Sequence, residues 1–264
     1  MRIQTLWRAL LLQGFVYALL CCVSLISSSL DEPLARPHPK GAQQRSQTTT
    51  KKRATKKRRR RAQRTESVGA TNHGSLKHGV HLDPDGDGLG YGFAVSPHRP
   101  DLWGTPELVR LVKRCGRTYR RYFSKKYAPI PIGDLSSRRG GPLKEHKSHQ
   151  SGRDVDVGFM RKKPIKRGYF KDTSPKEMDL YAQWVVLKCF LDDPITQMVF
   201  IERTRVRALK RYIQRIYKKR PKKLKRYLSR FPRGQHKLIY PDKIHKSHMH
   251  VRIACPKGDR RCRG

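Results

Sequence analysis

Metal-binding side chains gather in two segments, His149-Gln-Ser-Gly-Arg-Asp-Val-Asp156 and His245-Lys-Ser-His-Met-His250. Six of the eleven histidines lie within or near these segments: His146, His149, His236, His245, His248 and His250. Zinc takes histidine nitrogens and carboxylate oxygens in a tetrahedron, and a catalytic site leaves the fourth position to water. Two histidines and one aspartate would supply the three protein ligands. The two segments therefore predict a zinc site divided between distant parts of the chain.

Both segments run into stretches with the alternation of a β-strand. In Asp154-Val-Asp-Val-Gly-Phe159 the apolar side chains point to one face and the two aspartates to the other. The stretch His248-Met-His-Val-Arg-Ile253 alternates in the same way, with histidine and arginine opposite the apolar face. If the two strands are neighbours in one sheet, Asp156 and His250 stand within cross-strand reach. His149 can then complete the triangle from the preceding loop.

Helices and strands are predicted between residue 105 and the C-terminus. Helix starts are indicated by Thr105-Pro106 and by the capping box Ser174-Pro-Lys-Glu177. The expected helices cover about 105–122, 174–191 and 205–217, and the expected strands cover 130–135, 154–159, 197–201 and 248–254. Pro131 cannot donate to a ladder, which favours an edge position for the first strand.

This element order lacks a regular βαβ alternation. It favours an α+β domain, with a small antiparallel sheet that carries the zinc site and helices packed on one side.

The N-terminal third has a different composition from the rest. Residues 1–29 contain a long apolar run behind Arg2 and Arg8, which is typical of a signal peptide or an N-terminal anchor. Residues 30–77 have few large apolar side chains, and nine of the eleven residues from Lys51 to Arg61 are basic. Such a segment cannot bury a core, so we expect a disordered, highly basic arm. The folded domain is expected at 78–264.

The formal net charge of +41 indicates a polyanionic partner. A second dense set of basic residues lies between Arg203 and Arg230. In an exported protein, anionic envelope polymers or the membrane surface are better candidates than nucleic acid. The expected location is the periplasm or cell envelope.

Four cysteines lie beyond the leader, and an even number in an exported chain favours disulfides. Cys255 and Cys262 enclose a short polar turn that a bridge could close. Cys115 and Cys189 fall within helical patterns, where they fit either a bridge or buried free thiols.

Several longer motifs resemble the penicillin-insensitive murein endopeptidases, a family of the superfamily that includes lysostaphin-type peptidases, D-alanyl-D-alanine metallopeptidases and hedgehog domains. The motifs are Ile132-Gly-Asp-Leu-Ser136, Gly140-Gly-Pro142, His146 to Asp156, His245 to Arg252, and Cys255-Pro256. The resemblance covers most of 78–262. The chain departs from the family in two respects. It has no clear counterparts to the other cysteines of the family. It also has no clear Asp and His pair between Phe159 and Trp184 that could hold a second metal.

The resemblance implies roles for individual residues. The zinc ligands of the family are matched by His149, Asp156 and His250, and its catalytic histidine is matched by His248. Further active-site histidines are matched by His146 and His245. Of these two, His146 is a candidate additional ligand and His245 a candidate catalytic group. The resemblance also implies the Cys255–Cys262 disulfide. Asp154 is expected to fix a ligand histidine.

Together with the apolar leader, this resemblance implies an exported zinc endopeptidase that hydrolyses D-alanyl-diaminopimelyl cross-links between the peptide stems of peptidoglycan. No His-Glu-x-x-His segment supplies a glutamate base, so His248 is the candidate for proton transfer. Two alternatives stay open: a D-Ala-D-Ala carboxypeptidase or dipeptidase of the same superfamily, and a non-catalytic polyanion-binding protein with a structural zinc.

Overall fold

The computed structural model describes residues 64–83, 90, 92–99 and 101–264. The expected leader and the run from Lys51 to Arg61 lie outside these residues. No helix among the described residues has the length and apolar character needed to cross a membrane.

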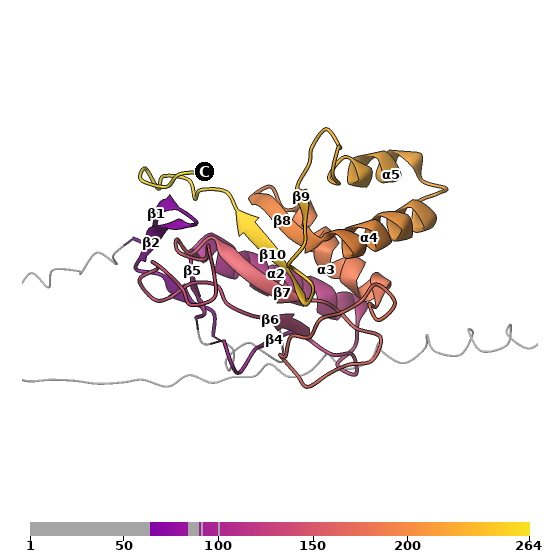
Figure 1. The fold of residues 1–264 in the computed structure, drawn as a ribbon, viewed down its shortest axis with the longest axis horizontal. Coiled ribbons are helices and arrows are strands. Elements are labelled where there is room, and N and C mark those ends of the chain that lie inside the picture. Colours follow the sequence, from indigo (N-terminus) through magenta and orange to yellow (C-terminus); the bar gives the residue numbers. More distant parts are fainter. Residues whose placement is uncertain (1–63, 84–89, 91, 100) are drawn as a thin grey trace, which may run out of the picture. The chain divides into compact units, whose positions relative to one another are not determined.

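A six-stranded sheet forms the centre of the domain (Figure 1). In spatial order its strands are β4 (Phe93–Val95), β6 (Ile130–Ile132), β7 (Asp154–Gly158), β10 (His248–Ile253), β8 (Thr196–Glu202) and β9 (Ile239–Asp242). The α+β class is confirmed, but the sheet is mixed and not purely antiparallel. The outer pairs β4–β6 and β8–β9 are parallel. Helical segments connect the two strands of each outer pair, and such crossovers return the chain in the same direction.

The sequence suggested that Pro131 places its strand at the edge of the sheet, and this prediction was wrong. β6 lies between β4 and β7, and its ladder to β7 is reduced to the pair Ile132↔Val157. Because this short ladder leaves proline outside it, the missing amide hydrogen interrupts no bond to β7.

The described residues contain the helices α2 (Pro106–Tyr122), α3 (Leu180–Asp192), α4 (Arg203–Ile216) and α5 (Pro221–Leu228). Thr105 caps α2 as predicted, and α4 agrees with the predicted basic helix. The helix predicted to begin at Ser174 in fact begins at Leu180. Ser174 and Glu177 close a separate turn, and Asp179 caps α3 by accepting from the amides of Tyr181 and Ala182. α5 was not predicted.

The apolar face of the sheet packs against the helices. Val155 and Val157 of β7 and Met249 and Val251 of β10 are fully buried. Gln183 of α3 donates from Nε2 to Met249 Sδ at 3.6 Å, which places α3 on this face. In Figure 1, α2 and α3 lie behind the sheet. The opposite face of the same strands is left for polar side chains.

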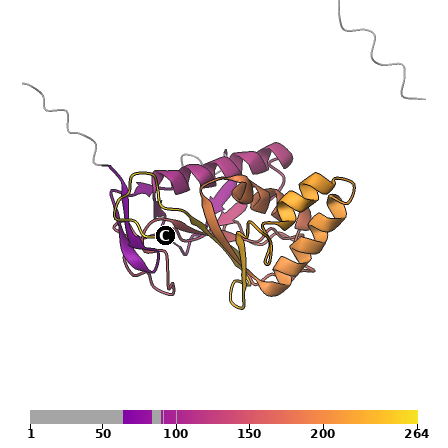
Figure 2. The ribbon, with the colours of Figure 1, turned by 90° about the horizontal axis from the view of Figure 1, so that it is seen from above.

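Two small sheets complete the domain: β1 (Glu66–Ala70) pairs with β2 (His73–Lys77), and β3 (Val80–His81) pairs with β5 (Trp103–Gly104). The predicted boundary at residue 78 is therefore too late. The hairpin formed by β1 and β2 is held by hydrogen bonds to the C-terminal tail. Gly69 N donates to Arg261 O at 2.8 Å, and Arg263 N donates to Gly69 O at 3.0 Å. In Figure 2 this hairpin lies at the opposite end of the domain from α4 and α5.

Both pairs of cysteines form disulfides. Cys255–Cys262 closes the C-terminal turn, as predicted. Cys115–Cys189, which the sequence left open, joins α2 to α3. The two bonds differ in the length of chain that they close, with sequence separations of 74 and 7 residues.

We expect replacement of Cys115 and Cys189 by alanine to lower the free energy of unfolding by about 4 kcal/mol, because the bond restricts a long loop in the unfolded chain. The matched change at Cys255 and Cys262 should cost about 2 kcal/mol. Urea unfolding followed by circular dichroism measures both. If removing Cys255–Cys262 lowered the free energy of unfolding more than removing Cys115–Cys189, chain entropy would not determine which disulfide stabilises the protein more.

Candidate metal centre

The pairing of β7 with β10 brings together the two segments for which the sequence predicts a metal site. His250 lies directly opposite Asp156 in the antiparallel register, as the alternation predicted. His149 approaches from the preceding loop: its Nε2 lies 3.1 Å from His250 Nδ1 and 3.3 Å from Asp156 Oδ1. The third side of this triangle, from His250 Nδ1 to Asp156 Oδ1, is 3.3 Å. Three of the predicted site residues thus present ligand atoms to one point.

The dimensions of this triangle suit zinc. A tetrahedral ion with bonds of about 2.0–2.1 Å separates its ligand atoms by about 3.3–3.4 Å. His149 and Asp156 are completely buried, and His250 is 5% exposed. Both carboxylate oxygens of Asp156 are buried without a hydrogen-bond donor among the described residues. A buried carboxylate without donors is costly, and a cation at this point would remove that cost.

His149 is held in the orientation that a ligand needs. Its backbone φ is 68°, in the left-handed region, where a residue other than glycine costs about 1 kcal/mol or more. Two contacts offset this cost: Nδ1 lies 2.7 Å from the carbonyl oxygen of Leu135, and the backbone amide donates to Asp154 Oδ2 at 3.0 Å. Because Nδ1 donates to the carbonyl, the lone pair on Nε2 faces the site. Gly152 turns the loop back with a φ of 71°.

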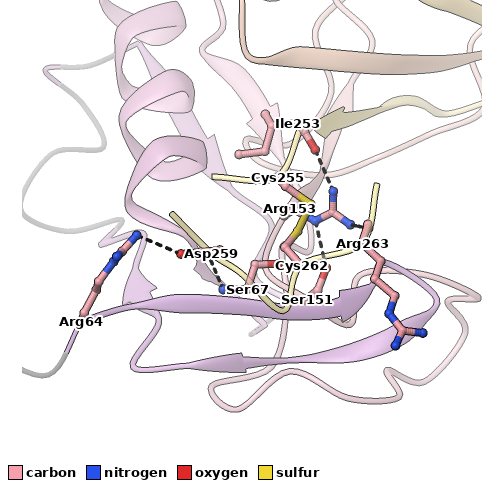
Figure 3. The surroundings of a disulfide bond; sticks show 9 residues. All are labelled: Arg64, Ser67, Ser151, Arg153, Ile253, Cys255, Asp259, Cys262 and Arg263. Carbon is pink, nitrogen blue, oxygen red and sulfur yellow. Dashed lines mark hydrogen bonds and ion pairs between the residues drawn. A yellow bond between two sulfur atoms is a disulfide. The ribbon is translucent and has the colours of Figure 1, made fainter. Parts of the chain in front are cut away.

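Arg153 ties this loop to the C-terminus (Figure 3). It is 1% exposed and donates to Ile253 O at 3.4 Å, to Arg263 O at 2.7 Å and to Ser151 Oγ at 3.3 Å. Arg263 directly follows the Cys255–Cys262 disulfide. The bonded C-terminal turn therefore supports the loop that carries His149. The sequence did not reveal a role for Arg153, because it is one of 61 basic residues.

Asp154 contacts both His149 and His250. It accepts from Arg252 Nε at 2.7 Å and from the His149 amide, and its Oδ1 lies 3.2 Å from His250 Nε2. The last contact lacks hydrogen-bond alignment. Burial alone would raise the pKa of Asp154, but His250 and Arg252 outweigh it and hold the pKa far below its ordinary value. Burial lowers the pKa of His250, yet Asp154 and Asp156 raise it to about 9.

His248 and His245 stand beside the triangle. His248 Nε2 lies 3.5 Å from Asp156 Oδ1, and its ring stacks on Phe170 with centroids 5.4 Å apart. Burial lowers the pKa of His248 to about 4, although Asp156 opposes the shift. His245 pairs through Nδ1 with Asp242, and burial lowers its pKa as well. At neutral pH His248 is therefore uncharged.

His146 occupies a second position near the metal point. It forms, with His149 and Asp156, a group whose ligand atoms lie within 4.8 Å of one another. Its Nδ1 is 3.9 Å from Asp156 Oδ2, farther than the ligand atom of His250. Its Nε2 lies 3.0 Å from Asp134 Oδ2, an oxygen that also accepts from Arg99 at 2.7 Å. The sequence assigned no role to Asp134, Arg99 or Asp242, which are recognisable only by these contacts.

An open cleft of about 570 Å³ gives access to the site. Its lining includes Arg99, His146, Lys147, Asp156, Phe200, Ile244, His245, His248, His250 and Arg252. His149 lies beneath this surface. The cleft is large enough for an extended peptide segment, and its walls combine basic and apolar side chains.

Comparisons with known proteins point to one family. The sequence model of the family described as penicillin-insensitive murein endopeptidase matches residues 67–264. Two curated proteins named penicillin-insensitive murein endopeptidase, from Klebsiella pneumoniae subsp. pneumoniae strain MGH 78578 and from Klebsiella pneumoniae strain 342, are each 27% identical to the chain over 201 residues. Each alignment covers 75% of this chain and 69% of the relative.

We expect Asp154→Asn to weaken zinc binding by about 10- to 100-fold, because it removes the charge beside His250 while keeping the size of the side chain. Titration against a chelating dye measures the affinity. The exposed Asp172 provides the matched control, and Asp172→Asn should bind zinc as the parent does. Equal affinities in all three proteins would exclude a supporting role for Asp154.

Proposed function

The chain belongs to the penicillin-insensitive murein endopeptidase family, and we propose on that premise that it is an exported zinc endopeptidase acting on peptidoglycan. Its substrates would be peptide stems joined by D-alanyl-diaminopimelyl cross-links. Its place would be the periplasm or cell envelope, held there by the leader and by attraction of the basic arm to anionic polymers or membrane.

One observation carries the metal part of this proposal. Asp156 is a fully buried carboxylate whose oxygens have no hydrogen-bond donor among the described residues, yet His149 and His250 aim nitrogens at the same point. Burial alone would raise the pKa of Asp156, but His149 and His248 hold it well below its ordinary value, so the group is charged. A charged carboxylate and two imidazoles at these separations form the donor set of a catalytic zinc site.

The remaining side chains suit peptide hydrolysis. When bound by the three ligands, zinc would bring the pKa of a water to near 7 and polarise a carbonyl group. His248 lies beside Asp156 on the cleft wall, and this position would let its Nε2 carry the proton that passes from the nucleophile to the leaving amine. Phe170 fixes its ring, and Ser247 Oγ lies 2.9 Å from its Nδ1. Asp242 orients His245 in the same cleft.

We expect His149→Ala, Asp156→Ala and His250→Ala each to lower the turnover of cross-linked muropeptide dimers by at least about a thousandfold, through loss of the metal. Chromatography of the digest measures the release of monomers. The exposed His236 provides a control, and His236→Ala should keep full activity. Full activity in the three ligand variants would refute the proposal. Release of terminal D-alanine without monomers would indicate the carboxypeptidase alternative.

His248→Ala should retain one zinc per chain but lower turnover by about 10²- to 10⁴-fold, because it removes a proton carrier and not a ligand. Metal analysis and digestion of the same sample separate the two effects. Loss of zinc from this variant would contradict the assignment.

His146→Ala distinguishes the two candidate ligand sets. With His250 as the third ligand, the variant should keep its zinc, whereas His250→Ala should lose it. The reverse result would assign the third position to His146.

A further inference from the structure

The two helices α4 and α5 form a basic hairpin, residues 203–237, at one end of the domain (Figures 1 and 2). This segment contains sixteen Lys and Arg residues and no Asp or Glu. Fourteen of the sixteen are exposed. Among the described residues, only Arg226 of these exposed cations forms an ion pair, with Asp192 at 3.0 Å. The hairpin therefore presents a large positive charge that the domain itself does not neutralise.

The charges lie on one side of α4. Its exposed cations Arg203, Arg207, Lys210, Arg211 and Arg215 recur at helical spacing. The other side buries Val206, Leu209 and Ile213 in the core. The basic stripe is thus the outer face of a helix that is already anchored by its apolar face.

Folding does not account for this arrangement. Like charges four residues apart, as at Arg207, Arg211 and Arg215, each destabilise a helix by about 0.2–0.5 kcal/mol. In α5, Lys222 and Lys223 occupy the first turn, where cations oppose the helix dipole, and no acidic residue is present there. A bound polyanion would reverse both costs. The electrostatics therefore point to a partner rich in negative charge.

Two features favour a lipid surface over nucleic acid. Binding of single strands uses exposed rings on which bases stack. In the hairpin Tyr227 is 4% exposed and stacks with Tyr217, and both rings contact Trp184 in the domain interior. At the end of α4, Ile216 is 39% exposed beside the cations that follow it. An exposed aliphatic side chain among cations suits the boundary between headgroups and acyl chains.

We propose that the α4–α5 hairpin docks the protein on anionic phospholipid bilayers, with its tip at residues 216–223 in contact with the headgroups. This inference goes beyond the proposed function and is independent of the zinc site. Each Lys or Arg near an anionic membrane surface contributes about 1 kcal/mol, so a few residues at the tip suffice for measurable binding.

The test is co-sedimentation of the full chain with vesicles of phosphatidylcholine alone or mixed with phosphatidylglycerol. Because the basic arm would also bind, all proteins carry serine in place of the nine Lys and Arg residues at 51–61. Partition on the neutral vesicles is subtracted, which removes any contribution of the apolar leader. The hairpin variant replaces Lys218, Lys219, Lys222 and Lys223 with glutamate. The control variant makes the same change at Lys125, Lys126, Lys162 and Lys163, which are exposed elsewhere.

We expect the hairpin variant to partition at least about a hundredfold more weakly than the parent, and the control variant to stay within a few-fold of it. Binding of the parent should disappear in about 0.5 M salt. A second hairpin variant with glutamine at the four positions should also bind weakly, and thermal unfolding checks that every variant is folded.

Equal partition of parent and hairpin variants would overturn the proposal, and so would equal losses in the hairpin and control variants, which would indicate net charge alone. A parallel titration with a DNA duplex tests the other class of polyanion. Loss of DNA binding with unchanged vesicle binding in the hairpin variants would assign the surface to nucleic acid.

Discussion

The register between β7 and β10 is the constraint on which the site depends. It sets His250 opposite Asp156 and, by the alternation of strands, turns Val155 and Val251 toward the helices. A shift of one residue in either strand would place its apolar side chains in the cleft and its ionisable side chains in the core. The same register therefore buries the apolar face and brings His149, Asp156 and His250 together. Hydrophobic packing on one face of the sheet determines where the ionisable side chains lie on the other face.

Burial of so many ionisable groups is balanced by their mutual pairing. Asp154 joins Arg252, the His149 amide and His250, and it remains charged because these neighbours outweigh its burial. Arg153 satisfies carbonyl groups at the end of β10 and at the C-terminus, and so connects the His149 loop to the disulfide-closed turn. Among the described residues, Asp156 is the buried carboxylate whose two oxygens both lack a hydrogen-bond partner. This charged acceptor is left for a cation.

Local patterns in the sequence predicted the parts of the fold that depend on neighbouring residues. Alternation identified β7 and β10, and capping residues identified α2. The parallel outer pairs of the sheet and the attachment of β1 to the C-terminal tail depend on contacts between distant residues, which no local pattern contains. The site followed the same rule. His149, Asp156 and His250 stood out because histidines cluster, whereas Arg153 resembled any other basic residue. The metal-binding roles of His149, Asp156 and His250 were suggested first by the clustered residues and then by the family resemblance, and they stay predictions.

The central claim is that His149, Asp156 and His250 hold one zinc ion. Anomalous scattering at the zinc absorption edge, measured from crystals of the zinc-loaded chain, tests it most directly. The account predicts a single peak within about 2.0–2.2 Å of His149 Nε2, Asp156 Oδ1 and His250 Nδ1. A peak bound by His146 in place of His250, or no peak between these side chains at saturating zinc, would contradict it.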